Sequence, residues 1–178
     1  QVIQMLCQLN TAEADHVLLG ALRHQLKSEA SLSIRLDLLE VAEKRGEGAL
    51  VDVACELESQ RDLKDPLAHY RECLAGGNAE HGEKVFFKNK KVTCVRCHMV
   101  NERGGSVGPN LSKVGREKTV EYLLESIVLP SAKISPGYST VQFLMATGRV
   151  QSGVVKKEES DFFVIQNADG DFLTLQKD

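Results

Sequence analysis

The motif Cys94-Val95-Arg96-Cys97-His98 constrains this chain more than any other feature of its sequence. Two cysteines two residues apart, followed directly by a histidine, form the attachment pattern of c-type haem. The spacing has a physical reason, because thiols one helical turn apart can each add to one of the two vinyl groups of a haem. The adjacent imidazole is then held under the iron as its proximal ligand. The motif therefore predicts one covalently attached haem c, bound through Cys94, Cys97 and His98.

Two other kinds of site use a pair of cysteines at this spacing. A structural zinc site needs a second Cys or His pair at suitable spacing, and only His81 stands upstream of the motif. A thioredoxin-type redox pair belongs to a strand-then-helix context, whereas this motif follows an amphipathic helical pattern. Haem attachment is the interpretation that the sequence favours.

The residues after the motif resemble the loop that follows the haem motif in class I cytochromes c. This loop contains Gly108-Pro109-Asn110-Leu111, ten residues beyond His98, and then Gly115-Arg116. In that family the proline carbonyl accepts the N–H of the proximal imidazole, which fixes the ring and raises its basicity. The resemblance assigns this role to Pro109 and packing against the haem to Leu111. Arg116 is a candidate partner for a haem propionate, because guanidinium groups suit carboxylates.

The chain divides by its pattern at Gly76-Gly77. Residues 1–76 predict a helical bundle or a HEAT-like repeat segment, and residues 77–178 predict the c-type cytochrome domain. The expected helices of the first part cover about 10–26, with Asn10 as N-cap, then 32–45, 49–60, and 65–76 with Pro66 in the first turn. Gly46 is the expected end of the second of these helices.

The second part predicts helices and a haem loop over 77–136, followed by strands. Helices are expected at about 79–88 and 117–129, with residues 89–116 mostly as loop. After Pro136-Gly137 the apolar period changes from 3.6 to 2, which predicts a small antiparallel β meander over 137–178. The fold class expected from these patterns is α+β, mainly α.

A narrower resemblance covers about 100 residues. Residues 77–178 are similar to the haem-binding domain typical of planctomycetes and verrucomicrobia. The matching stretches are Gly82–Phe87, Cys94–His98, Gly104–Ser112, Tyr122–Ile127, Pro130–Ile134, Gly137-Tyr138 and Gly148–Gly153. In that family the domain often ends large secreted proteins that begin with a propeller similar to sugar dehydrogenases and continue with helical repeats. The resemblance implies an electron-accepting role beside an oxidising domain.

The resemblance leaves the sixth iron ligand open. In this family a Met-Pro stretch and a final helix follow the strands, and that Met is the expected ligand, whereas this sequence ends at Asp178. Met145 is the candidate distal ligand within the chain, although β-core packing explains it as well. Tyr138, Lys113 and His81 are chemically able to bind iron, and Met99 directly follows His98 and does not readily reach the opposite haem face. The start at Gln1 leads us to expect a processed form or a fragment of a longer protein.

The charge is unevenly distributed along the chain. The net charge is −6 over residues 1–80, +6 over 81–118 and −3 over 119–178. The basic region 81–118 predicts a docking face for an acidic redox partner or a dehydrogenase domain. The region is too small and too poor in aromatic residues to favour nucleic acid. No apolar run approaches the roughly 20 residues that a transmembrane helix needs.

Three functions remain in consideration. The first is one-electron transfer by a covalent haem c that serves an attached or partner dehydrogenase, as a carrier module more than as a catalyst by itself. The second is a haem protein with an open distal site, peroxidase-like or gas-binding, for which Arg103 or Arg149 would have to supply the polar distal group. The third is a haem-free interaction module, which leaves the Cys94–His98 motif unexplained. Because haem is attached covalently on the oxidising side of a membrane, we expect a periplasmic or secreted location.

Three cysteines lie outside the motif, namely Cys7, Cys55 and Cys73. An odd number cannot pair completely within one chain. Cys7 and Cys55 fall on expected apolar helix faces, where a thiol is usually small and buried. A disulfide between Cys55 and Cys73 is an alternative in an oxidising compartment.

Overall fold

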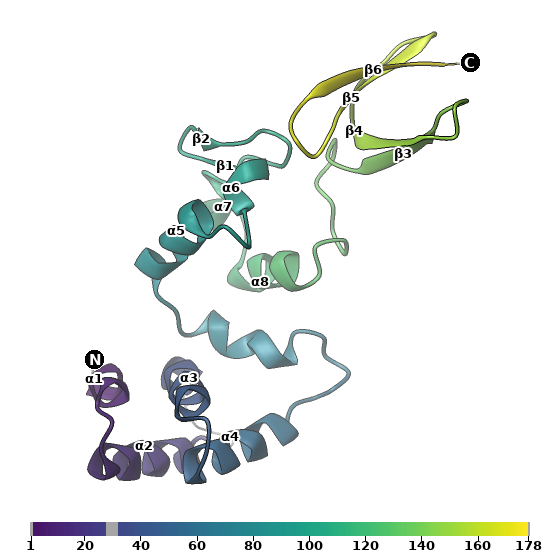
Figure 1. Ribbon diagram of the computed structural model, residues 1–178. Coiled ribbons are helices and arrows are strands. Elements are labelled where there is room, and N and C mark those ends of the chain that lie inside the picture. Colours follow the sequence, from purple (N-terminus) through teal and green to yellow (C-terminus); the bar gives the residue numbers. More distant parts are fainter. Residues whose placement is uncertain (1, 28–31, 178) are drawn as a thin grey trace. The chain divides into compact units, whose positions relative to one another are not determined.

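A computed structural model describes residues 2–27 and 32–177 of the chain. The protein divides into two compact units, Gln1–Asn78 and Ala79–Asp178 (Figure 1). The described part of the first unit is helical, and the second unit combines short helices with two antiparallel sheets. The predicted α+β class, mainly α, is therefore confirmed. No helix among the described residues is long and apolar enough to cross a membrane.

The first unit is built from short helices that begin and end close to the predicted positions. Its elements are α1 (Val2–Gln8), α2 (Ala12–His24), η1 (Leu32–Ile34), α3 (Arg35–Arg45), α4 (Ala49–Ser59) and η2 (Ala68–Leu74). The N-cap of α2 is Thr11 and not Asn10, because the extended backbone of Thr11 lets its hydroxyl accept the Ala14 N–H at 3.2 Å. Gly46 ends α3 in the left-handed conformation, as predicted.

The core of the first unit lies where α2, α3 and α4 pack on one another. Leu18, Leu22 and Leu38 are completely removed from solvent there. Helix α1 covers α2 and α3 from one side, and Cys7 on it is half-buried. Cys55, expected on a buried helix face, is exposed instead. This unit closes its core with its own side chains.

The predicted fourth helix over 65–76 is shorter and of a different type. The carboxylate of Asp65 accepts the Leu67 N–H at 3.0 Å, and a 3₁₀-helix, η2, then runs over Ala68–Leu74. Arg61 donates to the Ala68 carbonyl, which in an α-helix would accept from residue 72. This side-chain contact was not visible in the sequence.

The second unit places short elements where a loop was expected. After α5 (Ala79–Lys88) come α6 (Cys94–Cys97), the hairpin strands β1 (Met99–Val100) and β2 (Arg103–Gly104), α7 (Val114–Glu117) and α8 (Val120–Val128). The hairpin turn holds Asn101 and Glu102 at φ of 48° and 63°, the left-handed pair that a tight hairpin needs. The expectation of loop over 89–116 was therefore only partly correct.

The predicted β meander is present. Strands β3 (Thr140–Leu144), β4 (Val150–Glu158), β5 (Phe162–Gln166) and β6 (Phe172–Gln176) pair in chain order, each antiparallel to the next (Figure 1). Val155, Ile165 and Leu173 stand opposite one another in adjacent strands. The rings of Phe143 and Phe163 pack on the same face with centroids 5.0 Å apart. Ile165 is fully buried, so the sheet has a small core of its own.

The helical part of the second unit is packed much less closely. Between residues 79 and 136, Leu124 is the one apolar side chain that is buried. Val120 and Ile127 of α8 are exposed, and Ile127 keeps 79% of its surface in solvent. Protein atoms therefore cover only part of the apolar face of α8.

Candidate functional site

The two cysteines of the motif lie on the single turn of α6. Cys94 and Cys97 are three residues apart on this turn, both are half-buried, and both are free thiols. The turn is closed by the His98 N–H, which donates to the Cys94 carbonyl at 3.0 Å. Residues three apart on a helical turn face the same side. The two sulfur atoms can therefore approach one flat ligand from the same edge.

His98 follows the turn with an extended backbone, at φ −107° and ψ 143°. Its Nδ1 lies 2.9 Å from the Pro109 carbonyl oxygen. A carbonyl only accepts hydrogen bonds, so this contact fixes the proton on Nδ1 and leaves Nε2 with its lone pair. Among the described residues no group hydrogen-bonds Nε2. The ring is thus held in the tautomer and orientation that a metal ligand needs.

Three glycines make this arrangement sterically feasible, and the resemblance had placed them in matching stretches without giving them a steric role. A Cβ on Gly108 would lie 2.7 Å from Cε1 of the His98 ring. A Cβ on Gly104 would lie 2.1 Å from the His98 carbonyl, and one on Gly105 1.9 Å from the Arg96 carbonyl. Only residues without a side chain fit against the motif at these positions. Their spacing after a Cys-x-x-Cys-His motif is the signal that could have revealed them.

Backbone hydrogen bonds fold the glycine-containing loop back onto the motif. The Gly105 N–H donates to Val95 at 2.9 Å, and the Gly108 N–H donates to Cys97 at 2.8 Å. The Leu111 N–H then donates to Met99 at 2.8 Å. These bonds place Pro109 and Leu111 beside the motif, and Leu111 is half-buried there.

Two further interactions involve side chains in or near the motif. Arg96, between the two cysteines, forms an ion pair with Asp169 in the turn between β5 and β6. Arg103 on β2 lies over the ring of Phe87 on α5, with 4.1 Å between the guanidinium carbon and the ring centroid. Neither contact was predicted, because each joins residues from elements whose relative placement the sequence does not show.

The remaining predicted residues lie further from this centre. Arg116 is exposed on α7 and makes no ion pair with any described residue. Met145 is half-buried in the turn after β3, where its N–H donates to the Arg149 carbonyl at 2.9 Å. Met145 thus belongs to the β meander, whereas His98 belongs to the loop around α6. The structure groups Cys94, Cys97, His98, Pro109 and Leu111, and it does not add Met145 to them.

The residues present fit a covalently held haem. The thiols share one turn, the imidazole offers a lone pair on Nε2, and the surrounding apolar side chains are only partly covered by protein. A porphyrin is a large apolar group, which such side chains can bury. Within the described parts of the chain, no group of three or more His, Cys, Asp or Glu side chains is arranged to hold a metal ion by itself.

Comparison with known proteins agrees with this geometry. The model of the Cytochrome c family matches residues 79–161. The match begins at the first residue of the second unit and covers α5 to α8, β3 and β4. A search of curated proteins finds no match to the chain. The family match supports a c-type cytochrome domain in residues 79–161, with haem binding and electron transfer as its activity.

Proposed function

We propose that residues 79–178 form a one-electron carrier with a single covalent haem c. Cys94 and Cys97 carry the two thioether links, and His98 Nε2 is the proximal iron ligand. The observation that carries the proposal is the 2.9 Å contact of His98 Nδ1 with Pro109, which leaves Nε2 free beside the two thiols. The match of this segment to the Cytochrome c family supports it.

The haem and the protein chain would contribute different parts of the chemistry. Haem supplies an iron that takes up and releases one electron. Pro109 holds the His98 ring and raises its basicity, and the half-buried Leu111 beside the motif would pack against the haem. Gly104, Gly105 and Gly108 let the loop approach closely enough to do so. Because the chain holds the imidazole in one position, little protein movement accompanies electron transfer.

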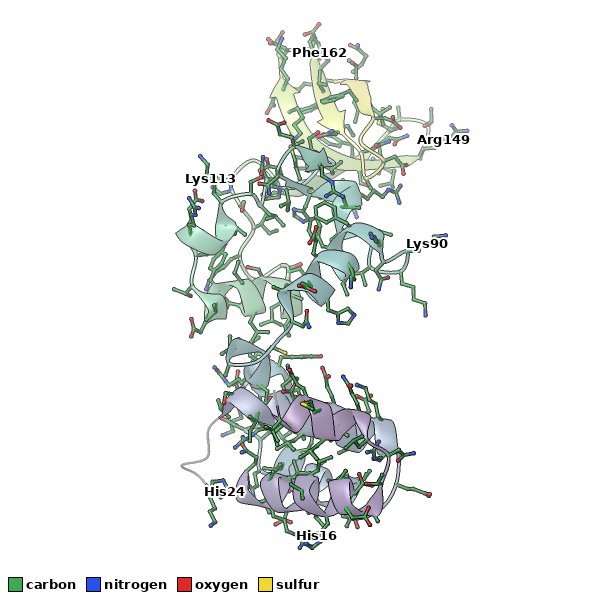
Figure 2. All side chains as sticks on the ribbon, turned by 90° about the vertical axis from the view of Figure 1, so that its left-hand side faces the viewer. His16, His24, Lys90, Lys113, Arg149 and Phe162 are labelled. Carbon is green, nitrogen blue, oxygen red and sulfur yellow. The ribbon has the colours of Figure 1, made fainter. Side chains whose placement is uncertain are left out.

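The redox partner docks through basic side chains of region 81–118. All nine Lys and Arg side chains of this region are exposed. Figure 2 shows Lys90 and Lys113 pointing to opposite sides of the second unit, so we expect one of the two sides to be the docking face. The sequence had suggested one basic face, and the structure separates it into a group at Lys88–Lys91 and another at Lys113–Lys118. Variants that neutralise the charges of one group at a time identify the docking group. Only the variant of that group should lower the rate of association with the redox partner and weaken its dependence on salt concentration.

The family-level details form part of the same proposal. The domain is of the planctomycete and verrucomicrobial type, and the helices of residues 1–76 are the end of a HEAT-like segment. The carrier accepts electrons from an attached or partner dehydrogenase in the periplasm or outside the cell. The sequence stretches shared with that type of domain support these statements.

The alternative is a haem protein with an open sixth position, which would bind gases or act as a peroxidase. This alternative stays open because Met145 lies in the turn after β3 and not in the loop that holds His98. A polar distal group would then be required, and Arg103 is already placed over Phe87.

A visible spectrum of the purified protein, oxidised and then reduced, with carbon monoxide added last, tests the proposal. Low-spin haem c bands that carbon monoxide does not move support a carrier with two protein ligands. Bands shifted by carbon monoxide support the open site, and the absence of haem bands overturns both. Met145→Ala should convert the first spectrum into the second if Met145 is the distal ligand. Met5→Ala, on exposed α1, is the matched control.

A further inference from the structure

We propose that Asp169, in the turn between β5 and β6, acts through Arg96 to set the reduction potential of the haem. Its carboxylate pairs with the guanidinium of Arg96, which stands inside the Cys94–His98 motif, and offsets a positive charge there. Figure 1 shows the turn between β5 and β6 lying next to the loop that follows β2. The inference rests on the proposed function, since it concerns the potential of the haem proposed there.

The turn between β5 and β6 presents Asp169 in one position. The side-chain oxygen of Asn167 accepts the N–H groups of Asp169 and Asp171, both at 2.9 Å. Gly170 completes the turn at a φ of 93°, and its carbonyl accepts from Nε2 of Gln166 at 3.2 Å. Gln166 is itself buried. The backbone under the Asp169 carboxylate is therefore held by two side chains of its own hairpin.

The backbone of Arg96 is held as closely. Its N–H donates to the Thr93 carbonyl at 3.0 Å, and a Cβ on Gly105 would lie 1.9 Å from the Arg96 carbonyl oxygen. Arg96 shares the single turn of α6 with Cys94 and Cys97, so its side chain begins between the two attachment points. Because both backbones are held, forming the ion pair restricts only the two side chains.

A second approach joins the same turn to the loop around His98. A Cβ built on Gly170 would lie 3.8 Å from Cγ2 of Val107, so the turn lies against this loop. Val107 is half-buried and directly precedes Gly108, the residue that faces the His98 ring. The turn thus reaches the motif at two places, one between the cysteines and one next to the residue that packs on the histidine.

The pair is placed to act by charge more than by stability. The side chains of Arg96 and Asp169 are 57% and 63% exposed, and an exposed ion pair contributes little to folding. Oxidised haem iron carries one more positive charge than reduced iron. A positive charge nearby therefore raises the reduction potential, and a negative charge lowers it. Asp169 offsets the charge of Arg96, which would otherwise act alone.

Redox titration of the full-length haem protein and its variants tests this inference. Asp169→Asn should raise the reduction potential, because Arg96 keeps its charge. Arg96→Gln should lower the potential, because the carboxylate of Asp169 is then unpaired. The double variant should return close to the potential of the unsubstituted protein. Both single shifts should shrink at about 1 M salt, where the screening length is about 3 Å.

Asp171→Asn is the matched control, because it removes the same charge from the same turn and leaves the partner of Arg96 in place. We expect its shift to be smaller than that of Asp169→Asn. Unchanged potentials, shifts of the same sign in both single variants, or an equal shift in the control would overturn the inference. The visible spectrum reports separately on the proposed function. Absence of haem bands from the unsubstituted protein would overturn that function, whereas haem bands with unmoved potentials would overturn this inference alone.

Discussion

Gly108 is the position where one methyl group should disturb the haem centre most directly. A Cβ on this residue would lie 2.7 Å from Cε1, 2.9 Å from Nδ1 and 3.2 Å from Nε2 of His98. The whole ring faces the added atom, so the imidazole or the loop must move, and the 2.9 Å contact with Pro109 lengthens. Overpacking costs about 1–3 kcal/mol, and a lost hydrogen bond costs about 0.5–1.5 kcal/mol. We therefore expect Gly108→Ala to destabilise the haem protein by about 2–4 kcal/mol.

The assay is urea unfolding of the haem protein, followed by haem absorbance and far-UV circular dichroism. Gly115→Ala is the matched control, because Gly115 lies in α7 and a Cβ there meets no atom within 4 Å. Alanine is favoured over glycine in a helix by up to about 1 kcal/mol, so this variant should be neutral or slightly stabilised. We also expect Gly108→Ala to change the reduced spectrum and the redox potential. Equal stability and identical spectra of the two variants would refute the steric argument.

Three further predictions concern the first unit. Leu18→Ala should cost about 2–5 kcal/mol in urea unfolding because Leu18 is fully buried, whereas the exposed neighbour Val17→Ala should stay within about 0.5 kcal/mol. Arg61→Met removes the closer partner of the buried Glu72 carboxylate and leaves it only Arg35 at 3.9 Å, so it should cost about 1–3 kcal/mol in the same assay; a loss below that of Val17→Ala would contradict a structural role for the pair. The hydrogen bond from Arg71 lowers the pKa of Asp65 from its ordinary 3.8, so the pair stabilises the fold above that pH, and the stabilisation disappears as the pH falls through the lower folded value. Carboxyl carbon NMR should show this pKa rising in Arg71→Met, and an unchanged titration would disprove the contact.

The sequence predicted the parts of this structure that depend on local pattern. The change of apolar period after Gly137 located the meander, and Gly46 located the end of α3. The resemblance to class I cytochromes c assigned the Pro109 carbonyl to the His98 ring, and the two lie 2.9 Å apart in the structure. The role of His98 in holding iron stays a prediction.

The failures share a different cause, which is that they depend on contacts between distant segments. Asp65-Pro66 is typical of an α-helix start, but Ala68–Leu74 is a 3₁₀-helix whose first carbonyl accepts from Arg61. Arg96 reaches Asp169, 73 residues further along the chain. The close approach of Gly105 to the Arg96 carbonyl also follows from the path of the loop and not from its composition. Periodicity and capping rules hold no information about such contacts.

The two units differ in how they complete their cores, and this difference predicts how each depends on haem. Leu18, Leu22 and Leu38 are fully buried by protein in the first unit, and Ile165 is fully buried in the meander. Between residues 79 and 136 only Leu124 is buried, while Ile127 and other apolar side chains face solvent. A segment with few buried apolar contacts opens with a small free energy. We therefore expect the helical part of the second unit to need the apolar surface of the proposed haem to become stable.

Hydrogen exchange of a haem-free Cys94→Ser/Cys97→Ser double variant measures this dependence. We expect the amides of α2, α3 and β5 to keep the protection that they have in the haem protein. The amides of α5 and α8 should lose theirs, because a ligand that binds only the folded state stabilises that state by its own binding free energy. Full protection of α8 without haem would mean that this segment folds on protein contacts alone. The partial burial seen along 79–136 would then no longer argue for a porphyrin among those side chains.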